Sequence, residues 1–182
     1  DKTKIVCFTA SSNVTSYITD TKEMVRLAKE KGAIAIVDGA QFTPHCKTDV
    51  QDMGCDFYVF SGHKMLSPMG IGVLYGKEEI LDYMDPFLYG GDMIEYVYEG
   101  HSTYAKSPAK FEAGTQNVGG AVGLAKAIEY IEKIGIENIH KRERELTDYA
   151  YEKLSQNPNI EMYFPREEKY RGVNIAFNIK DA

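Results

Sequence analysis

Two short segments hold most of the side chains that could do chemistry, VDGAQ at residues 37–41 and SGHK at residues 61–64. They bring together a carboxylate (Asp38), an amide (Gln41), a hydroxyl (Ser61), an imidazole (His63) and an amine (Lys64). Each has an ordinary structural explanation when taken singly, since an Asp that closes a strand commonly forms a turn, and loop lysines and histidines are usually solvated. Their combination favours a binding site.

The chemistry that fits this set is that of pyridoxal 5′-phosphate (PLP). The aldehyde of PLP forms a Schiff base with a lysine amine, and its pyridine nitrogen needs a carboxylate to stay protonated, so that the ring acts as an electron sink. Its phosphate is held by hydroxyl, imidazole and backbone donors. The two segments together supply each of these groups, and the sequence therefore predicts a PLP site.

The elements that would position these groups follow from the apolar pattern. Residues 5–10, 33–38 and 56–60 are short β-rich runs, and the first two are separated by an amphipathic helix at 21–32. A strand–helix–strand order indicates a parallel sheet covered by helices. Ligands of such sheets bind outside the carboxyl ends of the strands, where Ser12 and Asn13 follow the first strand, as Asp38 and Lys64 follow the others.

The rest of the sequence predicts other kinds of structure than strand–helix–strand units. Residues 70–76 form a strand that can return antiparallel, and 85–118 lack clear periodicity, which is typical of functional or interface segments. Helices are predicted at 117–135 and 136–156, the second with Leu146, Tyr149, Ala150 and Leu154 facing inward, and strands near both ends of 157–179. We expect the domains to divide as 1–135 and 136–182, although a boundary near residue 119 or 139 also fits the composition.

Composition excludes several classes of protein. The chain has 182 residues, a net charge of -6 and 43% apolar residues. A net acidic chain without basic blocks is a poor candidate for nonspecific nucleic-acid binding, and neither an apolar run of about 20 residues nor a signal peptide is visible. Three cysteines without a CxxC motif support neither a zinc site nor a disulfide framework, so we expect no metal and a cytoplasmic location.

Longer strings carry a resemblance to a known family. VDGAQ, DFYVFSGHK, PMGIGVLYG, GGDMI and KFEAGTQN, in this order and spacing, resemble the cysteine desulfurase/selenocysteine lyase family, a branch of the class V aminotransferases. The likeness runs from TASSNV near the start to GVNIAFN near the end. It implies an α/β fold of the PLP-dependent transferase large-domain type, with a mostly parallel sheet flanked by helices, followed by the start of a small C-terminal α+β domain.

The resemblance also implies roles around the cofactor ring. Lys64 would be the Schiff-base lysine and would move protons at the substrate α-carbon and at C4′ of PLP. Asp38 would pair with the pyridinium nitrogen, and Gln41 would hydrogen-bond the phenolic oxygen. Asn13 would lie near that oxygen and near the substrate carboxylate.

The phosphate would be held by Ser61 and His63 and, from a neighbouring subunit of a homodimer, by Thr115. The family often has Arg where Lys110 stands and Pro where Gln116 stands, so the shape of the Thr115 loop differs from the family pattern.

The implied activity is conversion of L-cysteine, or of L-selenocysteine, to L-alanine, with the sulfur left as an enzyme persulfide for an acceptor protein in iron–sulfur cluster assembly. Two alternatives stay open, another class V activity such as transamination or epimerisation, and a non-catalytic excised domain. Because the sequence does not begin with Met, we expect an internal segment of a longer chain. It would lack the family's upstream His that stacks on the ring, the upstream Thr loop, the downstream substrate-binding Arg and the nucleophilic Cys.

The cysteines and remaining histidines of this chain are predicted to have structural or surface positions. We expect Cys7 to be a buried, inert thiol within its strand, and neither other cysteine to be reactive. We expect His45 and His101 to lie in surface loops and His140 on the surface of a helix.

Overall fold

The computed structural model describes residues 2–163, 165 and 167–180. The strands are β1 (Ile5–Thr9), β2 (Ile34–Asp38), β3 (Phe57–Ser61), β4 (Gly72–Gly76), β5 (Ile94–Tyr98), β6 (His101–Tyr104), β7 (Ile160–Tyr163) and β8 (Ala176–Ile179). The α-helices are α1 (Thr21–Glu30), α2 (Val50–Met53), α3 (Glu78–Tyr83), α4 (Val118–Ile134) and α5 (Ile136–Ser155). Short 3-10 turns cover Gly62–Met65, Ala109–Phe111 and Glu168–Tyr170.

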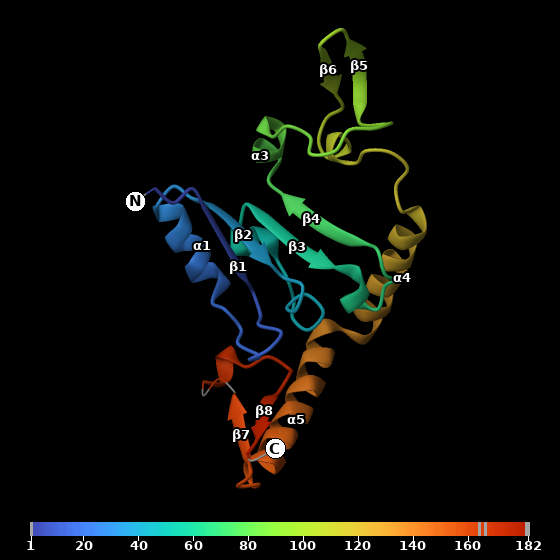
Figure 1. Ribbon diagram of the computed structural model, residues 1–182. Helices are drawn as coiled ribbons and strands as arrows, with labels where there is room; N and C mark the ends of the chain where they lie inside the picture. Colours follow the sequence, from blue (N-terminus) through green and yellow to red (C-terminus); the bar gives the residue numbers. More distant parts are fainter. Residues whose placement is uncertain (1, 164, 166, 181–182) are drawn as a thin grey trace.

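The central sheet has the strand order β1-β2-β3-β4 (Figure 1). β1, β2 and β3 are parallel, and β4 returns antiparallel to β3, in register at Tyr58 and Tyr75. The predicted α/β fold with a mostly parallel sheet is therefore confirmed, including the antiparallel return. The register also fixes the strand ends, because Thr9 lies opposite Asp38 and Asp38 lies opposite Val59.

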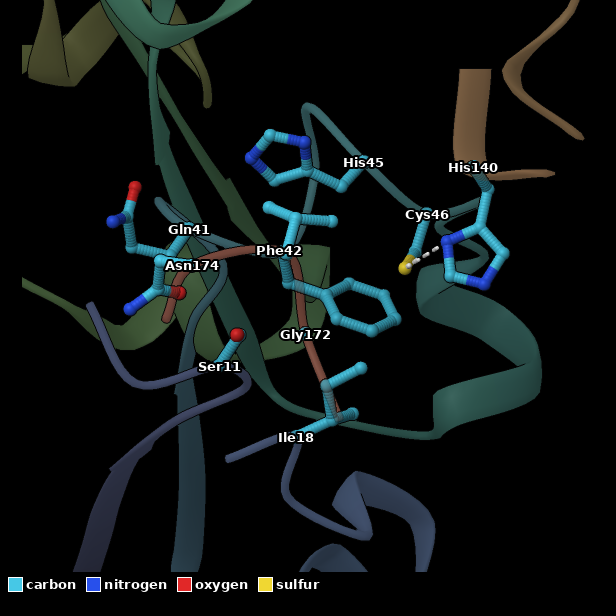
Figure 2. Close-up of a pocket in the computed structure, with 10 residues that line it drawn as sticks. Ser11, Ile18, Gln41, Phe42, His45, Cys46, His140, Gly172 and Asn174 are labelled. Atoms are coloured by element: carbon cyan, nitrogen blue, oxygen red, sulfur yellow. Dashed lines mark hydrogen bonds between the residues drawn. The ribbon is translucent and has the colours of Figure 1, made fainter. Parts of the chain in front are cut away.

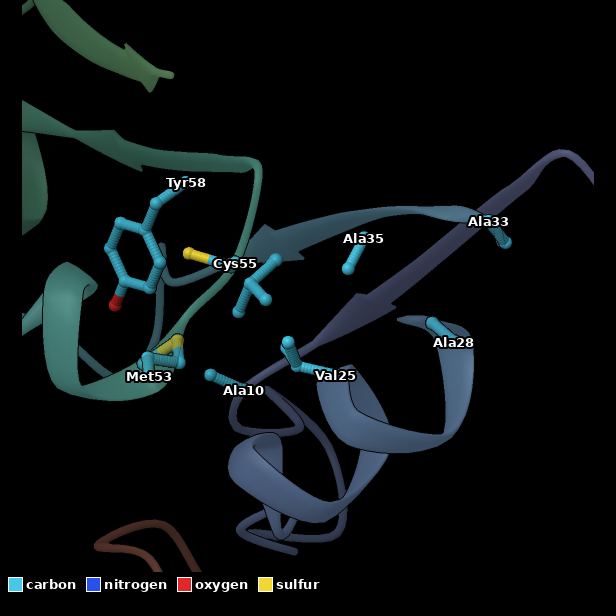
Figure 3. Close-up of a cluster of buried hydrophobic side chains, with 9 residues drawn as sticks. Ala10, Val25, Ala28, Ala33, Ala35, Met53, Cys55 and Tyr58 are labelled. Atoms are coloured by element: carbon cyan, nitrogen blue, oxygen red, sulfur yellow. The ribbon is translucent and has the colours of Figure 1, made fainter. Parts of the chain in front are cut away.

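The hydrophobic core lies between α1, α2 and one face of the sheet (Figure 3). Asp20 begins α1 by accepting a hydrogen bond from the Glu23 amide, which satisfies one of the free N–H groups of the first turn. The helix then buries the small side chains of Val25 and Ala28, which allow its backbone to approach the sheet closely. The buried cluster consists of Ala10, Val25, Ala28, Ala33, Ala35, Val37, Met53, Cys55 and Tyr58.

A buried carboxylate ties the sheet to α1 and to the start of α3. Asp56 Oδ1 lies 2.5 Å from Lys29 Nζ and 3.1 Å from Lys77 Nζ, and Asp56 Oδ2 accepts a hydrogen bond of 2.9 Å from the Ala35 amide. Burial by itself raises the pKa of Asp56, but the hydrogen bonds from Lys29, Ala35 and Lys77 outweigh it, so the pKa lies below its ordinary value. The carboxylate is thus held ionised inside the fold.

The stretch 85–118 contains more regular structure than predicted. β5 and β6 pair antiparallel and form a hairpin that projects away from the central sheet (Figure 1). The run IEYVY of β5 is rich in β-branched and aromatic residues, and Gly100, with φ +86°, lies at the turn that follows. The prediction of an irregular segment was therefore wrong at the hairpin, although most side chains of β5 are exposed.

The final third consists of the long helices α4 and α5 and the hairpin of β7 and β8. Gly135 alone separates the two helices, and its φ of +86° is a conformation that favours glycine. Thr147 is the buried residue of α5, whereas Leu146 and Tyr149 are 51% and 62% exposed.

The prediction that Leu146 and Tyr149 face inward was therefore wrong. The packed stripe of α5 passes through residues 140, 143, 147 and 150, which follow one another at helical spacing, and both side chains lie off this stripe. Among the described residues, none of the helices combines the length and apolar character needed to cross a bilayer.

Candidate active site

The carboxyl ends of the three parallel strands lie at one edge of the sheet, as predicted. β2 ends at Asp38 and β3 ends at Ser61, and the Ala10 amide at the end of β1 donates a 2.7 Å hydrogen bond to the Asp38 carbonyl. Asn13 lies in the loop that follows β1, and its backbone carbonyl accepts a hydrogen bond from the side-chain amide of Asn174. The parallel topology thus gathers the groups that follow all three strands at one edge.

Asp38 has a carboxylate of which one oxygen is hydrogen-bonded within the protein. Its Oδ1 atom accepts a 2.9 Å hydrogen bond from the Ala40 amide, and the side chain is half-buried. Among the described residues no group donates to Oδ2. One carboxylate oxygen is therefore fixed by the backbone while the other can serve a ligand.

The turn after Asp38 depends on a glycine. A Cβ atom at Gly39 would lie 1.9 Å from the hydroxyl oxygen of Tyr58 and 2.1 Å from its Cζ atom. The Gly39 carbonyl also accepts hydrogen bonds from the amides of Phe42 and Thr43 and so closes the turn. Gln41 is carried on this turn, and its side chain borders the adjoining cavity (Figure 2).

The SGHK segment forms a tight 3-10 turn directly after β3. Gly62 is buried, and a Cβ atom there would lie 2.7 Å from the Ile71 side chain, so this position also requires glycine. The turn leaves His63 and Lys64 exposed. Within the described parts of the chain, no residue forms a hydrogen bond or ion pair with the Lys64 amine, which is consequently free to react.

Thr115 is the predicted site residue that the structure does not join to this group. It lies in the exposed loop between the Ala109–Phe111 turn and α4. The loop is anchored on either side of it, since Asn117 accepts from the Gly120 amide and donates to the Gly70 carbonyl. Lys110, at the other end, is buried and donates to the Asp82 carbonyl.

A small cavity of about 170 Å³ adjoins the turn that carries Gln41 (Figure 2). Gln41 is the one predicted site residue on its wall. The other walls come from elements far apart in the sequence, and the lining residues are Ser11, Ile18, Gln41, Phe42, His45, Cys46, His140, Gly172, Val173 and Asn174.

Two histidines on this cavity, predicted to be surface residues, are half-buried, and each contacts another side chain. His45 Nδ1 lies 2.8 Å from Glu143 Oε1, and His140 Nδ1 lies 3.7 Å from Cys46 Sγ. Both contacts join the loop after β2 to α5, a pairing across nearly 100 positions that no local sequence pattern signals. His101 is exposed as expected, but it begins β6 rather than lying in a loop.

The three cysteines differ from one another in exposure. Cys7 is exposed, so its predicted burial was wrong; successive side chains of β1 point to opposite faces of the sheet, and Val6 and Phe8 occupy the face that packs against the core. Cys55 is buried, and burial raises its pKa. Burial, together with the nearby charge of Glu143, raises the pKa of Cys46 to about 11. In the described part of the chain, no group of three or more His, Cys, Asp or Glu side chains could hold a metal ion.

Known proteins resemble the whole of this chain. A probable cysteine desulfurase from Staphylococcus aureus is 53% identical over 181 residues, which cover 100% of this chain and 44% of that protein. The crystal structure of a cysteine desulfurase from Escherichia coli matches with a TM-score of 0.92 and 36% identity, over 98% of this chain and 44% of that one. The apo structure of the cysteine desulfurase from Thermococcus onnurineus NA1 matches with a TM-score of 0.93 and 39% identity, over 98% and 45%.

This chain thus spans less than half the length of these relatives. Their structures share its α/β architecture, which confirms the predicted fold class. The aminotransferase class-V family model matches residues 1–182. Since that match extends over the full length of the sequence, the chain belongs to the class-V aminotransferase family.

Proposed function

We propose that this chain is the PLP-binding portion of a cysteine desulfurase. The observation that carries the proposal is the free amine of Lys64 at the sheet edge where the half-used carboxylate of Asp38 also lies. Similarity to cysteine desulfurases over essentially the whole chain supports the same assignment. The finer assignment of each residue follows the resemblance of its motif to the family, and the chemistry of each group fits the needs of the cofactor.

The donor set of this edge fits PLP. The Lys64 amine would bond to the aldehyde carbon of PLP, and the free oxygen of Asp38 would accept a hydrogen bond from the protonated pyridine nitrogen. Gln41 and Asn13 supply amide groups for the phenolic oxygen, and Ser61 supplies a hydroxyl for the phosphate. His63, exposed beside Ser61, would add an imidazole, and Thr115 would reach the phosphate of a second subunit in a homodimer.

When bound, PLP supplies an electron sink for the charge that forms at the substrate α-carbon. The residues of this chain would do the remaining work. The Lys64 amine would remove the α-proton of L-cysteine and would later donate a proton at C4′ of PLP. Asp38 would keep the ring nitrogen protonated throughout.

In the whole protein, we propose that L-alanine is the organic product and that the sulfur passes to a cysteine thiol and then to an acceptor protein for iron–sulfur clusters. L-selenocysteine is a second possible substrate of the same chemistry. We expect this to occur in the cytoplasm and in a homodimer. None of Cys7, Cys46 and Cys55 has the role of sulfur acceptor in this proposal, and the chain alone would form no persulfide from cysteine.

Absorbance titration with PLP tests the cofactor assignment. We expect a near-visible band that grows with added PLP in the wild type and is absent in Lys64→Ala, whereas Lys47→Ala, which removes another exposed lysine, keeps it. Borohydride reduction followed by peptide mapping should place the label on Lys64. A band that survives Lys64→Ala, or a label on another lysine, would refute the assignment.

A further inference from the structure

The buried hydroxyl of Tyr58 and the half-buried hydroxyl of Thr43 form a pair next to the turn that joins Asp38 and Gln41. Tyr58 is 1% exposed, and its hydroxyl oxygen lies 2.8 Å from Thr43 Oγ1. Thr43 Oγ1 in turn donates a 2.9 Å hydrogen bond to the Gly39 carbonyl. These contacts connect β3 to the turn that follows β2.

Which group donates in the Tyr58–Thr43 hydrogen bond follows from the number of protons available. A threonine hydroxyl has one proton, and in Thr43 the Gly39 carbonyl takes it. The Tyr58 hydroxyl must therefore donate to Thr43 Oγ1. Its other neighbour, Thr48 Oγ1, is 3.5 Å away, at the limit of hydrogen bonding. Thr43 is consequently the main partner of a phenol that has no access to water.

The aromatic ring adds a steric constraint to the polar one. The Tyr58 ring occupies the space where Gly39 lacks a side chain. The Gly39 carbonyl receives three donors in total, from the Phe42 amide, the Thr43 amide and the Thr43 hydroxyl. The Gly39 carbonyl thus fixes both the backbone of the turn and the Thr43 side chain. Gly39 is one residue from Asp38 and two from Gln41.

We propose that Tyr58 and Thr43 are positioning residues that hold Asp38 and Gln41 in place for the cofactor. The proposal rests on the proposed function, because it takes Asp38 and Gln41 to be the groups that meet PLP. Neither hydroxyl touches the cofactor in this account. Both act through the Gly39 turn.

The test uses Thr43→Val, Tyr58→Phe and the double variant. Amide hydrogen exchange of the peptide 39–46 is measured without cofactor, and PLP affinity and the position of its absorbance band are measured by titration. We expect Thr43→Val to speed exchange in the turn and to weaken PLP binding about fivefold, the factor that corresponds to one ordinary hydrogen bond. Tyr58→Phe should act in the same direction but less, since Thr43 still donates to Gly39.

The double variant measures whether the two hydroxyls act together. Thr43→Val leaves the Tyr58 hydroxyl buried without its main partner, and removing that hydroxyl as well relieves this cost. We therefore expect the double variant to bind PLP no more weakly than Thr43→Val alone. Additive losses would contradict the coupling.

Two matched controls separate positioning from general loss of stability. Tyr75 lies directly opposite Tyr58 on β4, and the Thr147 hydroxyl on α5 donates to the Val173 carbonyl much as the Thr43 hydroxyl donates to the Gly39 carbonyl, so Tyr75→Phe and Thr147→Val repeat the chemistry outside the hydroxyl pair. Both should leave the turn exchange and the absorbance band unchanged.

Two results would overturn the proposal. The first is unchanged exchange in the turn of Thr43→Val, and the second is faster exchange with wild-type affinity and band position. Failure of the proposed function is seen separately, as a wild-type chain that binds no PLP.

Discussion

Replacing Asp56 by Asn tests how much a single buried carboxylate stabilises the sheet. The wild-type side chain is 5% exposed and meets two ammonium groups as well as the Ala35 amide. Asparagine keeps an acceptor for the amide but places an uncharged group beside Lys29 and Lys77. Since charge-assisted hydrogen bonds contribute roughly 1.5–3 kcal/mol each, the loss is substantial.

The partners set the upper limit of this loss. Removing one member of a fully buried ion pair costs about 3–5 kcal/mol, but Lys29 and Lys77 are 39% and 28% exposed and regain water in the variant. We therefore expect the free energy of unfolding to fall by about 2–3 kcal/mol. For a chain of this size, that corresponds to a decrease in Tm of roughly 5–10 °C.

Urea or thermal unfolding followed by circular dichroism measures the effect, with Asp52→Asn as the control. Asp52 forms a 2.6 Å ion pair with Lys22, but both side chains are more than 60% exposed, and such surface pairs contribute about 0–1 kcal/mol. A loss in Asp56→Asn no larger than that in Asp52→Asn would refute the reasoning.

The pH dependence of the free energy of unfolding gives an independent check that the ionised Asp56 carboxylate stabilises the fold. Its pKa is lower in the folded chain than in the unfolded one, so its stabilisation is present above the ordinary carboxyl pKa of about 4 and is lost as the pH falls through the folded value. The wild type should lose more stability than Asp56→Asn as the pH falls through this range. Parallel curves for the two proteins would contradict the assignment.

The remaining predictions concern packing and thiol chemistry. Gly39→Ala places a methyl group against the Tyr58 ring and should lower stability by about 2 kcal/mol by overpacking, as measured by denaturant unfolding; an unchanged midpoint would contradict the close approach. With a maleimide at neutral pH, the exposed Cys7 should react first, and Cys7→Ser should remove the fast phase. Labelling of Cys46 should stay slow until the pH approaches 11, and Cys55 should react only on unfolding; fast labelling of either in the native chain would argue against their burial.

Local patterns were sufficient to predict the part of the fold that forms the site. Strands ending at Asp38 and near Ser61, with a helix before β2, indicate a parallel sheet, and that topology alone brings the strand ends together. At Gly39 and Gly62 an added Cβ atom would lie only 1.9 Å and 2.7 Å from a neighbouring side chain, so both positions need glycine. The motifs therefore contain both the reactive groups and the small residues that position them.

Long-range packing could not be predicted in the same way. Cys7 has the sequence surroundings of a buried strand residue, but its exposure depends on which face of β1 packs against the core, and Val6 and Phe8 occupy that face. The contacts of His45 with Glu143 and of Cys46 with His140 depend on where α5 lies relative to the loop after β2. The hairpin of β5 and β6 is a different case, because the β-branched and aromatic residues of β5 are a local strand signal that the prediction of an irregular segment overlooked.

The outer strands of the central sheet have a consequence for handling the chain by itself. In the described structure β1 and β4 each pair with one neighbour, so one side of each strand has backbone N–H and C=O groups without a ladder partner. Such edges are templates for the addition of further strands, and β4, with the sequence GVLYG, has no charged side chain to discourage it. We therefore expect this chain to self-associate through its edge strands at high concentration. Leu74→Lys, which places a charge on β4, should reduce that association.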